Sequence, residues 1–356
     1  MSDAVLVTGA FGLVGSATVR RLAANGRKVV ATDLDVEENR KAAAQLPSGV
    51  EVQWADLTNP DEVNALLGAV APAAIIHLAA IIAPFCYARA ALARKVSVDA
   101  TGHLVRAAEA QPQPPRFVQA SSVAVYGARN PHHLTDLLSA DTPMRPTDLY
   151  GTHKAEAEEL VRSSSLDWVV LRLGGVLTTD ISFDIKPEFL FFESALPVDG
   201  RIQTVDVRDV ATAFTAATTA DCVGEILLIG GDDATHRLTQ GDIGPATAAA
   251  LGLVGAIPVG RRGNPDSDAD WFATDWMDTT RAQEVLKFQT VSFPDILKET
   301  ADKAGWKRYP LRLVAPAAGY FLRRQSAYRN HPGHFADPWG AIRAKWGDPG
   351  PDRPAA

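Results

Sequence analysis

Short runs of consecutive apolar residues recur along the first half of the chain, and a stretch with helical character follows each run. Apolar runs without polar alternation are typical of strands that are buried on both faces, as in parallel sheets. The strict alternation of strand and helix predicts a doubly wound parallel α/β sheet of the Rossmann type. The predicted strands cover residues 4–8, 28–32, 50–54, 74–78, 116–120 and 168–172.

This rhythm stops near residue 175, and the remaining chain is richer in loops. We therefore expect a second, smaller C-terminal lobe that binds the substrate. The last residues, 347–356, are expected to be disordered. The expected boundaries are 1–175 for the Rossmann domain, with 202–220 returning to it, 176–201 and 221–310 for the substrate lobe, and 311–356 for a C-terminal extension.

A glycine-rich segment, Gly9-x-x-Gly12-x-x-Gly15, follows the first predicted strand and opens the first helix. Glycines permit a tight turn and a close approach of the backbone, so a pyrophosphate can lie on the helix N-terminus. In this position between strand and helix the motif predicts dinucleotide binding.

Acidic residues follow the second and third predicted strands. Asp33 lies where a carboxylate accepts hydrogen bonds from the adenosine ribose, and its charge would repel a 2′-phosphate, so NAD is favoured over NADP. Arg40 and Lys41 are interpreted as a solvated helix face, although an arginine reaching back could weaken that preference. Asp56 either contacts the adenine or is the N-cap of the next helix.

Tyr150 and Lys154 are four residues apart in a predicted helix and would therefore share one face. A nearby ammonium favours the phenolate and lowers a tyrosine pKa. Such a phenol can take a proton from an alcohol or return it to a carbonyl. An isolated Tyr-x-x-x-Lys pair on a solvated helix would carry no such function, so the pair needs a hydride acceptor and a second donor.

The order of these motifs resembles that of the extended short-chain dehydrogenases/reductases, which include the NAD-dependent epimerase/dehydratase family and the 3β-hydroxysteroid dehydrogenases. The resemblance implies that Tyr150 is the acid/base, that Lys154 holds the nicotinamide ribose, and that Ser122 steadies the substrate oxygen. It also implies a homodimer. The implied cofactor-binding residues are Gly9, Phe11, Gly12, Leu13, Val14, Gly15, Asp33, Asp56, Leu57, Leu78, Ala79, Ala80, Ser97, Ser121, Tyr150, Lys154, Leu173 and Val176.

The chain departs from the family pattern at several positions. Ser97 stands where the family commonly has Asn, and Val123-Ala124 replaces the Asp-Glu pair of the 4,6-dehydratases, so dehydratase activity is not expected. No Asn follows the sixth predicted strand, which favours a more apolar substrate than a nucleotide sugar. Four phenylalanines of the second lobe either contribute to such a site or form a small core: Phe183, Phe189, Phe191 and Phe192.

Composition excludes several other classes. A net charge of −7 and a pI near 5.6 argue against a nucleic-acid partner. Cys86 and Cys222, the two cysteines, have no disulfide or zinc spacing, and His132-His133 is interpreted as a solvated loop, so no metal site is expected. His77 is expected in the core. The start of the chain has no signal-peptide pattern, and a cytoplasmic protein is expected.

Residues 303–329 carry seven basic residues interleaved with aromatic and aliphatic ones. This pattern is compatible with peripheral contact to a membrane or partner, but a helix packed on its own substrate lobe is favoured. The sequence as a whole predicts an NAD-dependent oxidoreductase that interconverts a secondary alcohol and a ketone. The alternatives are a sugar-nucleotide epimerase that retains NAD and a non-catalytic NAD-sensing regulator.

Overall fold

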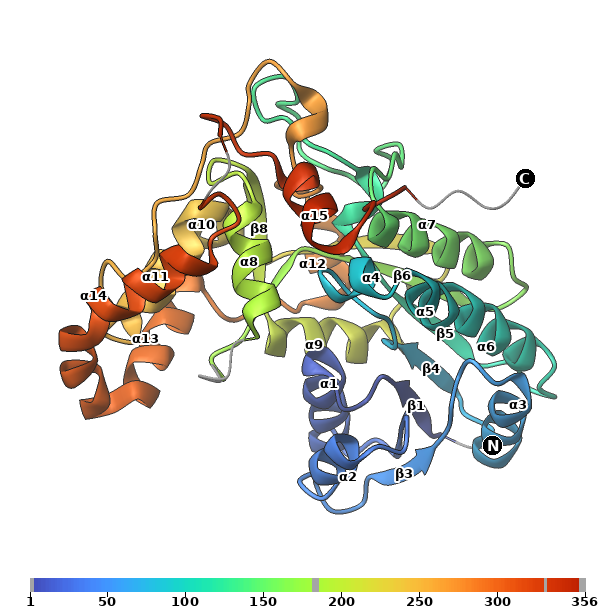
Figure 1. Ribbon diagram of the computed structural model, residues 1–356. Coiled ribbons are helices and arrows are strands. Elements are labelled where there is room, and N and C mark those ends of the chain that lie inside the picture. Colours follow the sequence, from blue (N-terminus) through green and yellow to red (C-terminus); the bar gives the residue numbers. More distant parts are fainter. Residues whose placement is uncertain (1–2, 181–185, 330–331, 352–356) are drawn as a thin grey trace.

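A computed structural model describes residues 3–180, 186–329 and 332–351 (Figure 1). Its main sheet has seven strands, all parallel, in the order β3-β2-β1-β4-β5-β6-β9. The doubly wound Rossmann fold predicted from the sequence is confirmed. The strands are β1 (Val5–Thr8), β2 (Val29–Asp33), β3 (Glu51–Trp54), β4 (Ala74–His77), β5 (Arg116–Ser122), β6 (Trp168–Leu173) and β9 (Glu225–Ile229).

Helices cover both faces of this sheet, and each layer buries its own apolar cluster. Val19 and Leu22 of α1 pack with Phe214 of α9 on one face, whereas Leu67 of α3 and Leu104 of α6 pack on the other. The flanking helices are α1 (Leu13–Ala24), α2 (Glu37–Ala43), α3 (Pro60–Val70), α6 (Ala100–Glu109), α7 (Leu149–Arg162), α9 (Val207–Ala217) and α12 (Thr280–Leu286).

Two boundaries differ from the expected ones. The strand β9, which the sequence analysis placed in the substrate lobe, pairs with β6 as the seventh strand of the main sheet. Residues 202–220 were expected to return to the Rossmann domain. Helix α9 packs against α1 of that domain, but β8 (Arg201–Asp206) belongs to a small separate sheet. Strand β9 has the apolar composition that a buried parallel strand needs. Its pairing with β6 was not expected, because the two strands are far apart in the sequence.

The smaller lobe contains a three-stranded sheet of order β10-β8-β7 and a group of helices. Figure 1 shows α11, α13 and α14 gathered at the side of the molecule away from β1 and α6. The elements are β7 (Gly175–Leu177), β10 (Arg237–Thr239), α8 (Pro187–Ala195), α10 (Asp233–His236), α11 (Gln240–Ala250), α13 (Phe293–Ala304), η4 (Gly305–Lys307), α14 (Arg308–Gln325) and α15 (Pro338–Trp346).

The C-terminal segment returns from α14 to the Rossmann domain. The Tyr328 hydroxyl donates to the Ala195 carbonyl (2.6 Å) and accepts from the Asp337 amide (2.7 Å), which fixes the start of α15. Residues 347–351, expected to be disordered, have defined positions, whereas 352–356 lie outside the described residues. Within the described ranges, no helix is long and apolar enough to cross a bilayer.

Candidate active site

The predicted cofactor loop lies where β1 and β4 are adjacent and the winding of the sheet changes direction. Such a switch point leaves a crevice at the carboxyl ends of the strands, where ligands of doubly wound folds bind. A Cβ on Gly15 would lie 2.0 Å from the Gly9 carbonyl oxygen. Glycine is therefore required at this position for the loop to close onto the helix.

Helix α1 presents an uncapped N-terminus to this crevice. Gly12 is its N-cap and offers no side chain to the first amides, including those of Leu13 and Val14. A Cβ on Gly12 would meet only the Gly9 carbonyl, at 3.5 Å, so the backbone is open to an approaching ligand. Unsatisfied amides and the positive end of the helix dipole fit a pyrophosphate.

Asp33, at the end of β2, lies next to this loop. Its carboxylate accepts hydrogen bonds from the amides of Leu34 (2.9 Å) and Phe11 (3.4 Å). Burial raises the pKa of Asp33, while these two amides oppose the shift. Arg40 does not reach back to Asp33, because it pairs with Asp35 at 2.7 Å on the exposed surface. The crevice therefore holds a carboxylate with no basic partner described beside it.

The third acidic position has a local role in the structure. The Asp56 carboxylate accepts from the amide (2.9 Å) and hydroxyl (2.7 Å) of Thr58, and Leu57 is buried behind it. The N-cap of α3 is Asn59 and not Asp56, because Asn59 accepts from the Asp61 amide. The alternative that made Asp56 the helix cap is wrong, and its place at a strand end keeps it near the crevice.

The loop after β4 closes the other side of the crevice. The Thr8 hydroxyl accepts from the amides of Leu78 (3.2 Å) and Ala79 (3.4 Å). Ser97 is buried in a π-helical turn, and its hydroxyl accepts from the Ile81 amide at 3.3 Å. Ser97 thus supports the loop that contains Ala80. Near by, burial lowers the pKa of His77 to about 3, as expected for a neutral core histidine.

Ser122 and Tyr150 come together because α7 packs closely on the turn that follows β5. A Cβ on Gly151 would lie 2.5 Å from the Ala124 carbonyl oxygen, so glycine permits this approach. Ser122 lies close enough to Tyr150 for its hydroxyl to lower the pKa of the phenol, against the rise caused by burial. The two predicted oxygen-binding groups therefore occupy one site, at the carboxyl end of a strand.

Lys154 lies one turn along α7 from Tyr150, with its Nζ 6.0 Å from the centre of the tyrosine ring. The ammonium donates a hydrogen bond to the Ala120 carbonyl at 2.9 Å. Burial lowers the pKa of Lys154 to about 8, and Glu158 opposes that shift. A desolvated ammonium held by one carbonyl retains donors for a further oxygen, such as a ribose hydroxyl.

The electrostatics of Tyr150 differ from the sequence expectation. Burial raises the pKa of Tyr150 well above its usual range, and the hydroxyl of Ser122 opposes that rise. Lys154 does not lower the pKa here, because it points to the Ala120 carbonyl and not to the phenol oxygen. Cys86 also raises it, and burial raises the pKa of that thiol as well, so Cys86 is not an activated nucleophile.

The two serines that end β5 face opposite ways, as successive strand residues do. The Ser121 hydroxyl donates to Glu158 and is buried away from Tyr150. Glu158 also binds Arg172 of β6 through two hydrogen bonds, of 2.6 and 2.9 Å, inside the protein. The side chain of Ser121 is therefore part of a buried polar network, and a contact of this residue with the cofactor stays a prediction.

Two residues after β6 were also assigned to the cofactor site. Leu173 ends β6 and packs against the apolar core below the sheet's carboxyl edge. Val176 lies in β7, opposite Val205 of β8, and packs on the same core. Both are partly exposed near this edge, so contact with a cofactor stays a prediction.

The sequence analysis overlooked Asp148, which positions Tyr150. Asp148 is the N-cap of α7 and accepts from the amides of Gly151 (3.1 Å) and Tyr150 (3.2 Å). Its other contact is the Tyr87 hydroxyl, which donates to it at 2.6 Å. An Asp directly before a predicted helix was the available signal.

An apolar wall, also overlooked, covers Tyr150. It comes from the C-terminal helix α15, which Figure 1 shows between α8 and α4. The Leu149 amide donates to the Pro349 carbonyl (2.6 Å), which fastens the end of this segment beside Tyr150. The residues that pack together here are Ile81, Ala83, Cys86, Tyr87, Ala93, Leu149, Tyr150, Phe192, Leu196, Phe272, Trp339, Ile342 and Trp346.

The described phenylalanines of the second lobe pack against other aromatic rings, and their contribution to a substrate site stays a prediction. Phe192 is buried in this wall, with its ring 5.5 Å from that of Phe272, while Phe191 packs against Trp346 at 5.4 Å. Phe189 contacts Phe85 at 5.1 Å. Phe183 lies outside the described residues.

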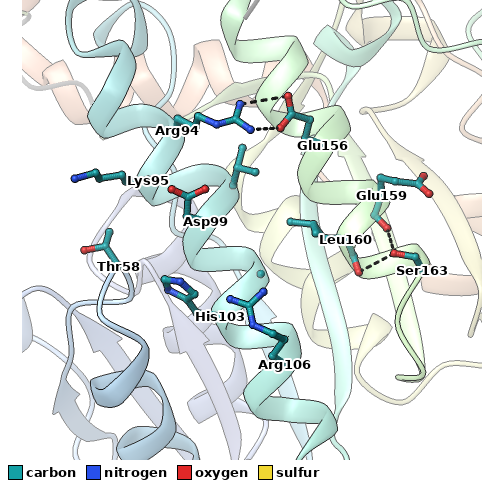
Figure 2. Close-up of a pocket in the computed structure, with 12 residues that line it drawn as sticks. Thr58, Arg94, Lys95, Asp99, His103, Arg106, Glu156, Glu159, Leu160 and Ser163 are labelled. Carbon is teal, nitrogen blue, oxygen red and sulfur yellow. Dashed lines mark hydrogen bonds and ion pairs between the residues drawn. The ribbon is translucent and has the colours of Figure 1, made fainter. Parts of the chain in front are cut away.

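Figure 2 shows a separate hollow of about 610 Å³ between α7 and the segment from α5 (Ala90–Arg94) to α6. Charges of both signs line it, and Arg94 pairs with Glu156 across it at 2.8 Å. It contains none of the residues Ser122, Tyr150 and Lys154. His133 pairs with Asp268 on the surface, and no group of three or more metal-ligating side chains occurs among residues 3–180, 186–329 and 332–351.

The sheet order and the packing of α7 on β5 are those of a Rossmann fold. Residues 5–178 match the model of the NAD dependent epimerase/dehydratase family. The resemblance described from the motifs is thereby confirmed.

Known relatives include both dehydrogenases and epimerases. D-erythronate dehydrogenase of Cupriavidus necator is 30% identical over 185 residues, which are 48% of this chain and 54% of that protein, so the match spans about half of the relative. UDP-glucose 4-epimerase of Thermus thermophilus, solved with NAD, has a TM-score of 0.67 at 23% identity, covering 85% of this chain and 98% of that one. MoeE5, solved with UDP-glucuronic acid and NAD, has a TM-score of 0.65 at 25% identity, covering 86% and 99%.

Proposed function

We propose that the protein is an NAD-dependent dehydrogenase/reductase that interconverts a secondary alcohol and a ketone. The closeness of Ser122 to Tyr150, beside the buried ammonium of Lys154, is the observation that supports this most directly. The uncapped N-terminus of α1 and the carboxylate of Asp33 suit NAD. The family and the curated relative are NAD-dependent enzymes, which supports an enzymatic role.

In the oxidative direction, Tyr150 in its phenolate form takes the proton of the substrate hydroxyl while the hydrogen on the same carbon leaves as hydride; in the reductive direction the neutral phenol, which burial favours, gives its proton to the ketone oxygen. NAD, when bound, supplies the hydride acceptor. Ser122 donates to the substrate oxygen and holds it against the tyrosine, where negative charge develops. Lys154 holds the cofactor ribose with the donors that the Ala120 carbonyl leaves free. The products are a ketone, reduced cofactor and a proton that Tyr150 passes to solvent.

The wall over Tyr150 favours an apolar substrate. The side chains of the wall that pack on the tyrosine are aliphatic and aromatic, and the nearby cations, Lys154 and Lys345, lie against the rings of Tyr150 and Trp346. A diphosphate needs charged or amide donors when it is removed from water. We therefore propose a secondary alcohol with apolar substituents and not a nucleotide sugar.

Epimerisation with retained NAD is the second candidate, because the solved relatives named above include an enzyme described as a UDP-glucose 4-epimerase. The same three residues would serve it. The cofactor distinguishes the two functions, since an epimerase re-reduces its ketone and accumulates no NADH. A non-catalytic NAD sensor would need none of Ser122, Tyr150 and Lys154.

The test is a screen of purified protein with NAD against sterols, aromatic alcohols and nucleotide sugars, followed by NADH absorbance. We expect steady NADH formation with an apolar alcohol. Tyr150→Phe should lower this rate by about 10²–10⁴-fold while NAD still binds. Tightly bound NAD and sugar interconversion without NADH would establish the epimerase, and an unchanged rate in Tyr150→Phe would overturn the role of the tyrosine.

A further inference from the structure

Helix α14 carries an aromatic and aliphatic stripe on the side that faces solvent. Trp306 is 74% exposed and Leu313 is 84% exposed, although both are large apolar side chains. With Tyr309, Ala317 and Tyr320 they follow the spacing of three and four residues that places side chains on one helix face. Val314 and Phe321 lie exposed at the edge of this stripe.

The opposite face of α14 holds the helix firmly on its own lobe. Ala315 and Gly319, four residues apart, are its fully buried residues. A Cβ on Gly319 would lie 3.1 Å from the Ala256 carbonyl oxygen, so small residues bring the helix close to the loop beneath it. Helix α14 therefore packs on the substrate lobe, as the sequence favoured, through a narrow seam formed by Ala315 and Gly319. The seam leaves the aromatic stripe uncovered.

Basic residues flank the stripe, and the segment that carries it contains no acidic residue. Between residues 303 and 336 the sequence contains seven Lys or Arg and no Asp or Glu, in a chain whose net charge is −7. Lys303 pairs with Asp180 at 2.8 Å. In the described part of the chain no ion pair is formed by Arg312, Arg323 or Arg324. Instead, the Arg324 guanidinium lies 4.7 Å from the centre of the Tyr320 ring, and those of Arg308 and Arg312 lie 5.2 and 5.9 Å from that of Tyr309.

We propose that α14, with Trp306 before it, docks on the surface of an anionic lipid bilayer. An exposed apolar stripe flanked by cations and free of carboxylates matches a headgroup layer, where apolar side chains enter and arginines meet phosphates. A protein partner at this surface would have to supply carboxylates that pair with these cations. The helix lies flat on the membrane, because its inner seam stays packed on the lobe.

The position of α14 supports this orientation. Figure 1 shows it at the outer side of the smaller lobe, away from β1 and the glycine-rich loop. Docking there leaves the cofactor crevice open to water. The inference does not depend on the proposed reaction, since it concerns a different face of the molecule.

The test is sedimentation of the full chain with vesicles of phosphatidylcholine alone or of equal parts phosphatidylcholine and phosphatidylglycerol. We expect binding to the anionic vesicles that weakens as salt is added. Leu313→Asp and Arg312→Glu should each lower the partition coefficient by roughly tenfold. Both side chains are exposed, so folding, followed by circular dichroism, should not change.

Matched controls are Val223→Asp, an exposed apolar residue before β9, and Lys41→Glu, an exposed cation on α2; both should bind as the wild type does. The proposal is overturned if the wild type does not sediment with anionic vesicles at low salt. It is also overturned if Leu313→Asp binds like the wild type, or if that substitution alters only the oligomeric mass, which would make the stripe a protein contact.

Discussion

The Nζ of Lys154 lies 6.0 Å from the centre of the Tyr150 ring and is bound to the carbonyl of Ala120 at 2.9 Å. The ammonium is thus placed beside the phenol without touching its oxygen. Because both groups are buried, the charged form of each is disfavoured. Burial of the Lys154 ammonium therefore costs folding free energy.

Lys154→Met should stabilise the protein while abolishing activity. The folded pKa of Lys154, about 8, lies below the unfolded value of 10.5. Burial of the ammonium therefore opposes folding fully below pH 8, and the opposition fades as pH rises toward 10.5. Without the charge, we expect up to about 3 kcal/mol more stability at pH 7. The Ala120 carbonyl still accepts from Gln119 in the variant.

Thermal unfolding of both proteins from pH 7 to pH 10.5 checks this prediction. The difference in melting temperature should shrink as pH rises. A variant less stable than the wild type at pH 7 would mean that Lys154 stabilises the fold, contrary to the sign derived from its burial.

Asp33→Ala should weaken NAD binding more than NADP binding. Removal of the carboxylate takes away the ribose acceptor and the repulsion of a 2′-phosphate, and it also frees the Phe11 amide. We expect about a tenfold or greater loss of NAD affinity, a typical cost for a charged hydrogen bond. Titration of tryptophan fluorescence with each cofactor measures both constants.

Glu37→Ala is the matched control, because Glu37 is an exposed carboxylate four residues away that pairs with Lys41. It should leave both affinities unchanged. Equal losses for NAD and NADP in Asp33→Ala would argue against a contact between this carboxylate and the ribose.

Trp339→Ala should change which alcohols are oxidised. Trp339 packs on Phe272 with ring centres 5.3 Å apart and donates to the Trp271 carbonyl at 3.2 Å, in the wall over Tyr150. Removal of the indole enlarges the space beside the substrate. We expect the ratio of kcat/KM for bulkier over smaller alcohols to rise roughly tenfold.

The corresponding control is Trp306→Ala, which removes an exposed indole from another part of the lobe. Steady-state kinetics with a series of alcohols of increasing chain length provide the measurement. If both variants keep the wild-type ratio, the wall does not select the substrate.

Arg172→Met should destabilise the protein by about 3–5 kcal/mol, because it leaves the buried carboxylate of Glu158 without its cation. Urea denaturation measures the loss. Arg281→Met is the control: Arg281 pairs with Glu225 at 2.7 Å but is half exposed, so its removal should cost less than about 1 kcal/mol. Similar costs for the two substitutions would contradict the role assigned to burial.

Local patterns in the sequence were sufficient for the Rossmann domain. Apolar runs and the glycines of the first turn specify strands and a loop from near neighbours alone, and Tyr150 and Lys154 are related by helix geometry. Strand β9 and the wall were not predictable in the same way. The bond between Leu149 and Pro349 joins positions 200 residues apart, and no periodicity reports such a contact.

The buried network shows the same difference. An arginine within the apolar run of β6 demands a partner, but the sequence cannot tell Glu158 from neighbouring acids of α7 such as Glu156 and Glu159. The structure selects Glu158, because it lies on the face of α7 that also carries Lys154. The roles of Ser122, Tyr150 and Lys154 could be proposed from the sequence, whereas the apolar wall that packs on Tyr150 could not.

The opposite orientation of Ser121 and Ser122 restricts how β5 can evolve. The strand is held in register with β6, where Ser121 lies opposite Arg172 and Ser122 opposite Leu173. Insertion or deletion of one residue upstream in β5 would exchange the two hydroxyls between the interior and the tyrosine. A single substitution on this strand therefore affects either the buried network or the site, whereas a change in its length affects both at once.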